Sequence, residues 1–141
     1  MLKRIVLIDR DHLRREQLAG ALARHGCEVA DFDAGRDALQ HLLFSSVSAV
    51  LLDYSSAFES QNPVPSGKRM VQEIINVDAF VPLLLICDRC ETLDPETSAA
   101  ADLVLRKPVT SKQILDGLET VLSETLRERA QRKSGYIFAF R

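Results

Sequence analysis

Two carboxylates and one lysine in this sequence follow short apolar runs. Asp53 comes after the run 49–52, Asp9 comes after the run 5–8, and Lys107 follows a third run closely. A carboxylate can act as a nucleophile or bind a hard cation, and a lysine supplies a positive charge. If the three runs are strands of one sheet, their side chains can gather at one edge of it.

The run 49–52 holds four consecutive apolar residues, which is typical of a strand buried on both faces of a parallel sheet. In open α/β sheets, functional sites form just outside the carboxyl ends of the strands. Asp53 would stand at such an end, and it is therefore the first candidate for a chemical role. The alternative is that Asp53 is only the polar residue that ends the strand.

Composition and charge narrow the class of protein. The chain has 141 residues, 46% of them hydrophobic, which is enough for one compact domain and too few for two ordinary ones. The net charge of −2 gives no basic field for nucleic acid, and the basic run 127–133 is interpreted as a solvated helix end. No apolar run of about 18 residues is present, which argues against a membrane span. Three cysteines, an odd number, favour reduced thiols and a cytoplasmic location.

Hydrophobic periodicity predicts strands that alternate with helices along the chain. Strands are expected at 4–8, 27–32, 49–53, 81–86 and 103–105. Helices are expected before Gly26 and over 36–44, 68–77 and 110–133, with a short helical segment near 96–101. The segment 54–67 is rich in Ser and Pro and is predicted to be a long loop.

Five strands that alternate with helices predict an α/β fold of the flavodoxin-like, doubly wound type, a (βα)5 three-layer sandwich. Helical crossovers between neighbouring strands favour a parallel sheet. The strand order 2-1-3-4-5 places the first and third strands side by side. That order brings Asp9 and Asp53 together, with Lys107 across the same edge.

These residues resemble the receiver domain of two-component response regulators. The resemblance rests on the frame 4–9, the turn 26–29 and the Leu-Arg-Lys-Pro segment 105–108, which stand at the spacing of that family. It extends over roughly residues 3–122. Each motif is weak by itself, and their order and spacing make the set fairly specific.

The resemblance implies a role for each candidate residue. Asp53 corresponds to the aspartate that accepts a phosphoryl group from a histidine kinase or phosphotransfer protein, and Lys107 to the lysine that pairs with the phosphate. Asp9 corresponds to the first residue of an acidic pair that holds Mg²⁺. The metal would then bind Asp9, Asp53 and Ser55, with Asp11 in the same acidic pocket. Such a domain is a signalling module and not an enzyme.

Three positions depart from the pattern of the family. Arg10 stands where the second acid of the pair is expected, Cys87 where a Thr or Ser donates to the phosphate, and Val104 where a mobile aromatic is expected. A thiol is a poor donor, and a guanidinium beside the metal repels it. Mg²⁺ binding is therefore doubtful. We expect the Arg10 guanidinium to lie near Asp9 and Asp53, the alternative being an arginine that faces solvent.

Two functions fit these residues. The first is a cytoplasmic receiver domain of a phosphorelay, with Asp53 as its phosphoacceptor. The second is a phosphorylation-independent pseudo-receiver that binds a protein partner or forms a homodimer. A flavodoxin-like enzyme has little support, because the sequence has no Gly-rich phosphate-binding loop.

The C-terminal segment does not belong to the resemblance. We divide the chain into a receiver domain, 1–125, and a second part, 126–141, that extends the last helix and ends in an apolar, aromatic tail. The tail 136–140 is predicted to be a strand or an apolar anchor that docks on its own domain or on a second copy.

Overall fold

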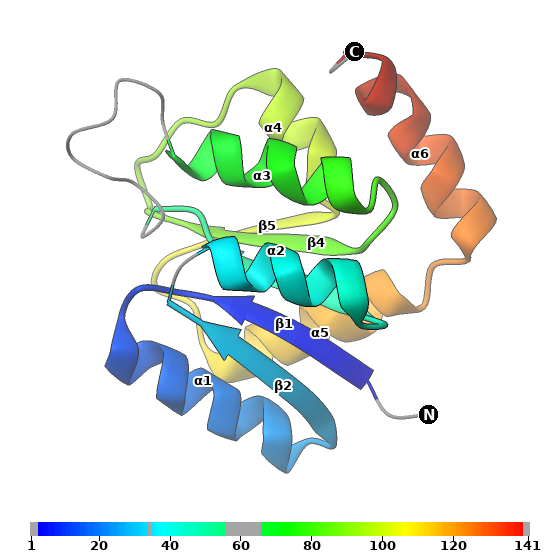
Figure 1. The fold of residues 1–141 in the computed structure, drawn as a ribbon. Helices are drawn as coiled ribbons and strands as arrows, with labels where there is room; N and C mark the ends of the chain where they lie inside the picture. Colours follow the sequence, from blue (N-terminus) through cyan, green and yellow to red (C-terminus); the bar gives the residue numbers. More distant parts are fainter. Residues whose placement is uncertain (1–2, 34, 56–65, 140–141) are drawn as a thin grey trace.

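A computed structural model describes residues 3–33, 35–55 and 66–139 (Figure 1). Most of the loop predicted at 54–67 lies outside these residues. No helix in the described part of the chain is both long enough and apolar enough to cross a membrane.

The centre of the structure is one parallel sheet of five strands in the order β2-β1-β3-β4-β5, which confirms the predicted fold and strand order. The strands are β1 (Lys3–Ile8), β2 (Cys27–Phe32), β3 (Ala49–Asp53), β4 (Leu83–Cys87) and β5 (Leu103–Arg106). β3 and β4 are buried along their whole length, as their continuous apolar runs predict.

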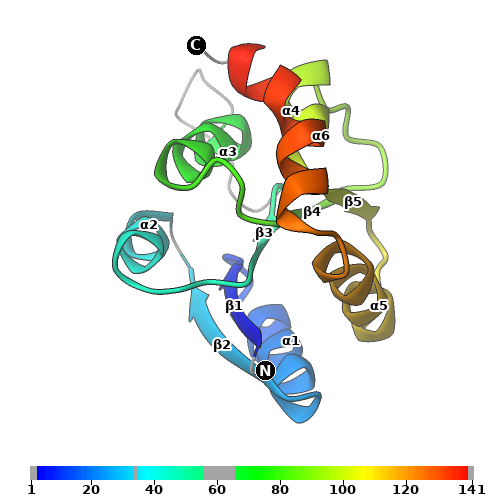
Figure 2. The same ribbon diagram turned by 90° about the vertical axis from the view of Figure 1, so that its right-hand side faces the viewer.

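Helices cover both faces of the sheet and complete three layers (Figures 1 and 2). The helices are α1 (His12–Arg24), α2 (Gly35–Phe44), α3 (Ser66–Val77), α4 (Pro95–Ala100), α5 (Ser111–Leu122) and α6 (Leu126–Ala139). Along β3, Val50 and Leu52 pack in the core that α2, α3 and α4 cover. Leu51 packs in the second core, against α1 and α5. Alternate side chains of one strand therefore build the two cores.

The ends of the helices follow local signals in the sequence. Gly26 adopts a φ of 86°, a conformation that glycine tolerates best, and it ends α1. The Thr110 side chain and Gln113 form a reciprocal capping box at the start of α5. The peptide bond between Lys107 and Pro108 is cis.

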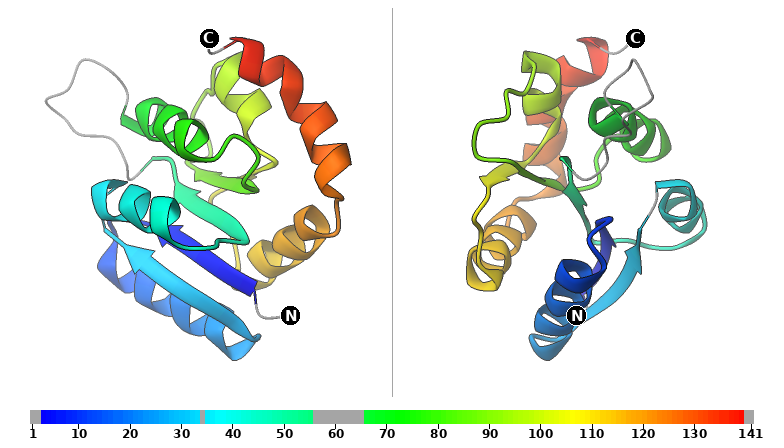
Figure 3. Two further views of the ribbon diagram at one scale, coloured as in Figure 1. Left: turned by 45° about the vertical axis from the view of Figure 1, so that its right-hand side comes forward. Right: turned by 90° about the vertical axis from the view of Figure 1, so that its left-hand side faces the viewer.

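The prediction of one long helix over 110–133 is wrong, because the helix ends at Leu122 and α6 begins at Leu126. The Thr125 hydroxyl accepts the backbone N–H of Glu128, and the Glu128 carboxylate accepts from Thr125, so a second capping pair starts a new helix. The turn redirects the chain, and α6 lies beside α4 (Figure 3). The tail is also helical up to Ala139, which contradicts the predicted strand.

α6 docks at the N-terminal edge of the sheet, opposite the edge that carries Asp53. The Lys133 side chain is fully buried, and its Nζ lies 2.9 Å from the Val81 carbonyl oxygen and 3.1 Å from Asp102 Oδ2. The backbone N–H of Leu83 donates to the same carboxylate at 2.6 Å, and Arg132 forms an ion pair with it. A buried ion pair therefore fixes the last helix to β4 and β5.

The interpretation of 127–133 as a solvated helix end is wrong for two of its members. Lys133 is buried as described, and Arg129 is only 8% exposed. The guanidinium of Arg129 donates to the Val121 carbonyl oxygen at the end of α5, over 3.1 Å. These two buried cations attach α6 to the rest of the structure, whereas Arg127 and Glu128 are exposed.

Candidate functional site

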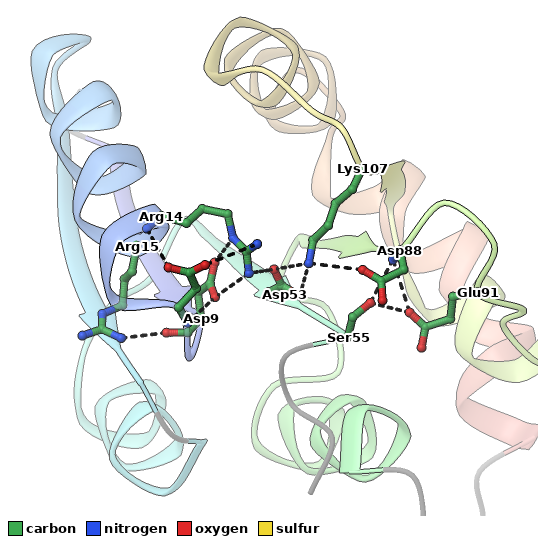
Figure 4. Close-up of polar contacts among 9 residues, drawn as sticks. Asp9, Arg14, Arg15, Asp53, Ser55, Asp88, Glu91 and Lys107 are labelled. Atoms are coloured by element: carbon green, nitrogen blue, oxygen red, sulfur yellow. Dashed lines mark hydrogen bonds and ion pairs between the residues drawn. The ribbon is translucent and has the colours of Figure 1, made fainter. Parts of the chain in front are cut away.

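Asp9 and Asp53 lie side by side at the carboxyl edge of the sheet (Figure 4). The pairing of Ile8 with Leu52 sets the two aspartates at neighbouring strand ends. Asp53 is 1% exposed and Asp9 is 2% exposed, so both carboxylates are removed from water. Two like charges roughly 5 Å apart repel by about 3 kcal/mol at an effective dielectric constant of about 20. The pair therefore needs positive charge beside it.

Arg14, in the first turn of α1, supplies one of these charges. Its Nε lies 2.7 Å from Asp9 Oδ2 and its Nη2 lies 2.8 Å from Asp9 Oδ1, a bidentate pair. The same Nη2 lies 2.5 Å from Asp53 Oδ2. One guanidinium therefore bridges two carboxylates that come from different strands. The hydrogen bond to Asp9 and the nearby Asp53 charge raise the pKa of Arg14 further above its already high value.

Arg10 does not have the position that the sequence argument gave it. Its side chain is exposed, and the guanidinium that pairs with both Asp9 and Asp53 belongs to Arg14. The physical reason is the start of α1. Asp11 caps the helix by accepting the backbone N–H of Arg14 at 3.0 Å, which begins α1 at His12 and carries Arg14 toward the strand ends.

Asp11 caps α1 and lies at the rim of the acidic pocket, where its Oδ2 is 3.9 Å from Nη1 of Arg14. Its backbone N–H donates to Asp9 Oδ1 over 2.9 Å, and its side chain is half exposed. The hydrogen bond from the Arg14 backbone holds the pKa of the Asp11 carboxyl below its ordinary value. Asp11 thus helps to fix Asp9 and Arg14 relative to each other.

Lys107 reaches the site from the segment after β5, as predicted. Its Nζ lies 3.0 Å from Asp53 Oδ2, 3.2 Å from Asp53 Oδ1 and 3.4 Å from Asp88 Oδ1. Asp53 therefore stands between two cations, Arg14 on the side of β1 and Lys107 on the side of β4. The two buried carboxylates and these two cations sum to zero formal charge.

Ser55 takes part in a separate set of hydrogen bonds beside Asp53. Its hydroxyl donates to Glu91 Oε1 at 2.5 Å and accepts the backbone N–H of Asp88 at 2.8 Å. Arg106 holds the same turn by donating to the carbonyl oxygens of Asp88 and Glu91. The Ser55 hydroxyl is thus directed to the β4 side of the site (Figure 4).

Cys87 and Val104 contribute to packing. Cys87 is fully buried, its Sγ lies 3.8 Å from the Leu105 carbonyl oxygen, and burial raises the pKa of its thiol. Val104 on β5 packs against the core on the α2 and α3 side. Neither side chain places a good hydrogen-bond donor beside Asp53.

The place between Asp9 and Asp53 that a shared cation would take is occupied by a side chain of the protein. In the described part of the chain, no group of three or more Asp, Glu, His or Cys side chains is placed to hold a metal ion. Mg²⁺ requires oxygen ligands in near-octahedral geometry. Between Asp9 Oδ1 and Asp53 Oδ2, where a shared cation would bind, the structure has Nη2 of Arg14.

Sequence reasoning found Asp9, Asp53 and Lys107, which the structure brings together, and it missed Arg14. An arginine in the first turn of a helix looks like an ordinary solvated residue. The available signal was Asp11, a preferred N-cap residue directly after Asp9 and Arg10. A helix start at that position places Arg14 one turn above the strand end.

Comparison with known proteins identifies the fold. No family model and no curated protein matches this sequence. A receiver domain protein from Clostridium thermocellum matches with a TM-score of 0.71 at 21% identity, over 86% of this chain and 94% of its own. A CheY-like receiver domain from Methanospirillum hungatei JF-1 matches with a TM-score of 0.68 at 19% identity, over 87% and 95%.

The chemotaxis response regulator CheY4 of Vibrio cholerae gives a similar result, with a TM-score of 0.67 at 21% identity over 86% of this chain and 99% of its own. At such low identity these likenesses show the fold. The chain therefore has the fold of response regulator receiver domains, and the roles of its individual residues rest on the geometry of the site.

Proposed function

We propose that this chain is a receiver-type signalling module of a phosphorelay, in which Asp53 accepts a phosphoryl group from a histidine kinase or phosphotransfer protein. The observation that carries the proposal is the position of Asp53, at the carboxyl end of the central strand and 3.0 Å from the Lys107 ammonium group. The receiver fold adds support. The module acts by changing its contacts with other proteins, in the cytoplasm and without nucleic acid.

The chemistry needs a carboxylate nucleophile and positive charge around the phosphoryl oxygens. A carboxylate oxygen of Asp53 attacks the phosphorus of a phosphohistidine, the P–N bond breaks, and the imidazole leaves and takes up a proton. The product is an acyl phosphate on Asp53. Lys107 is placed to pair with its new negative charge, and the Arg14 guanidinium suits phosphate equally well as carboxylate.

Incubation with a small phosphodonor such as acetyl phosphate or phosphoramidate, followed by intact mass measurement, tests the proposal. We expect a gain of one phosphoryl group at Asp53 that is absent in Asp53→Asn and is slow in wild type at millimolar Mg²⁺. A Lys107→Ala variant should be modified even more slowly than wild type. No modification in any variant, including those with a changed Arg14, would refute the phosphoacceptor role.

A second candidate is a phosphorylation-independent module that binds a protein partner or a second copy of itself. The bridge from Arg14 to Asp53 favours it, because this carboxylate already has two cationic partners. Beryllofluoride, which mimics the acyl phosphate, discriminates between the candidates. A shift of amide NMR signals around Asp53 supports the phosphoacceptor, whereas an unchanged spectrum supports the second candidate. Sedimentation velocity at several concentrations tests the predicted homodimer.

A further inference from the structure

The position that a divalent cation would take between Asp9 and Asp53 is filled by a side chain of the protein. A cation shared by the two aspartates must approach one oxygen of each. Nη2 of Arg14 does so, at 2.8 Å from Asp9 Oδ1 and 2.5 Å from Asp53 Oδ2. Its Nε adds a further hydrogen bond to Asp9 at 2.7 Å. Figure 4 shows these three contacts converging on one guanidinium.

The two buried carboxylates of the site already have cationic partners among its own side chains. Asp9 and Asp53 carry two negative charges, and Arg14 and Lys107 carry two positive charges within ion-pairing distance. The carboxylates of Asp11 and Asp88 also pair with these cations, at 3.9 Å and 3.4 Å, but they lie at the solvent-exposed rim. A dication between Asp9 and Asp53 would stand directly beside two fixed cations. Like charges at such short distances repel strongly, so a metal must expel Arg14 before it can bind.

Arg14 is held in place by the backbone as well as by its ion pairs. Its backbone N–H donates to the cap residue Asp11, whose own N–H donates to Asp9. The guanidinium is attached to α1, so it competes with dissolved ions at a high effective concentration. An arginine also keeps its charge at every accessible pH. The guanidinium is therefore always available to the two carboxylates, whereas a metal ion exchanges with the solvent.

We infer that Arg14 replaces the divalent cation of this site, so that the wild-type site is complete without Mg²⁺, and that removing the guanidinium uncovers a Mg²⁺ site formed by Asp9 and Asp53. This inference concerns the regulation of the site in the proposed function. It predicts that the module does not respond to Mg²⁺ concentration.

The test is a titration of thermal stability with Mg²⁺ alone, without any phosphodonor. We expect the Tm of wild type to stay constant across the millimolar range. Arg14→Gln should have a lower Tm without metal, and its Tm should rise with the logarithm of the Mg²⁺ concentration once the dissociation constant is exceeded. Arg10→Gln is the matched control, because it removes the same charge four residues away, and its Tm should not depend on the Mg²⁺ concentration.

Two further variants make the result specific. Asp9→Asn in the Arg14→Gln background should abolish the Mg²⁺ response, because it removes one of the two carboxylate ligands. Arg14→Lys keeps the positive charge but has one nitrogen in place of the planar guanidinium. It should therefore give a weaker Mg²⁺ response than Arg14→Gln. If Arg14→Gln does not fold, Arg14→Lys and the wild-type titration still decide the matter. Line broadening of NMR signals by Mn²⁺ gives a second, structural readout.

The inference is overturned if Mg²⁺ stabilises wild type as much as it stabilises Arg14→Gln, or if neither Arg14 variant responds to Mg²⁺ or Mn²⁺. These outcomes are separate from failure of the phosphoacceptor role. An Arg14→Gln protein that binds Mg²⁺ and still does not react with a phosphodonor would confirm the replacement and refute phosphorylation at Asp53.

Discussion

The ammonium group of Lys133 lies 3.1 Å from the carboxylate of Asp102, and the two side chains are 0% and 1% exposed. The two residues come from opposite ends of the C-terminal third of the chain, one in α6 and the other directly before β5. Burial lowers the pKa of Lys133, and the neighbouring Asp102 opposes this change. The pair attaches a helix outside the predicted domain to the edge of the sheet.

Removal of one partner of this buried pair should be costly. We expect Lys133→Ala to lower the free energy of unfolding by about 3–5 kcal/mol, because Asp102 is left as a buried carboxylate with fewer cations. Urea denaturation measures the change. Arg127→Ala is the control, since Arg127 is exposed on the same helix. Equal effects of the two substitutions would show that α6 is not fixed through Lys133.

The pair of Glu124 and Arg132 should make the attachment of α6 sensitive to acid. Hydrogen bonds from Arg132 hold the pKa of Glu124 below its ordinary 4.5. The stability from this pair is thus present above about pH 4.5 and lost as the pH falls through the lower pKa of the folded state. Near neutral pH, the free energy of unfolding of wild type should exceed that of Glu124→Gln by about 0.5–1 kcal/mol.

Thermal unfolding of wild type and Glu124→Gln between neutral pH and acid tests this dependence. We expect the difference in Tm to be constant at higher pH and to shrink below about pH 4.5. Glu119→Gln, an exposed carboxylate on α5, serves as control and should follow wild type. If the difference in Tm grew as the pH fell, its sign would be wrong, and the stabilising role of the ionised Glu124 carboxylate would be refuted.

The cap of α1 should support both the helix and the bridge. Asp11→Ala removes the acceptor for the backbone N–H of Arg14 and should cost about 1 kcal/mol of stability. Asp11→Asn keeps a good capping side chain and should cost much less. Chemical denaturation compares the variants. If Asn and Ala were equally destabilising at this position, the charge of Asp11, and not its role as a cap, would be the important property.

The three free cysteines should differ in reactivity toward a thiol reagent. Cys90 is exposed and should react rapidly in the native protein. Cys87 is fully buried, and burial raises the pKa of its thiol, so it should react only after unfolding. Timed labelling followed by mass spectrometry of peptides measures each rate, with Cys90→Ser as control. Fast labelling of Cys87 in the folded protein would show that its surroundings open readily.

The sheet and the position of Asp53 could be predicted because burial on both faces leaves a continuous apolar run. Strands such as β3 and β4 have this pattern, and the carboxyl ends of neighbouring strands must meet. The alternation of strands and helices predicts a doubly wound parallel sheet, and the order 2-1-3-4-5 is one of the orders known for such sheets. These features depend on patterns several residues long, which a single sequence displays directly.

Arg14 and α6 could not be predicted in this way. The choice between Arg10 and Arg14 depends on the residue at which α1 begins, a boundary that hydrophobic periodicity leaves uncertain. The break before α6 contains neither Gly nor Pro, and its signal is the pair of Thr125 with Glu128. The burial of Lys133 depends on where the helix travels after that break, which no local pattern encodes.

The position of Asp102 has a consequence for the synthesis of the chain. The sheet is complete after β5, but the two cationic partners of Asp102 have not yet been synthesised at that point. Arg132 lies 30 residues after Asp102 in the sequence, and Lys133 is next to it. A nascent chain therefore carries a finished sheet with an uncompensated carboxylate at its N-terminal edge. Docking of α6 (Leu126–Ala139) neutralises that carboxylate, so we expect resistance to cellular proteases to be acquired only after α6 has left the ribosome.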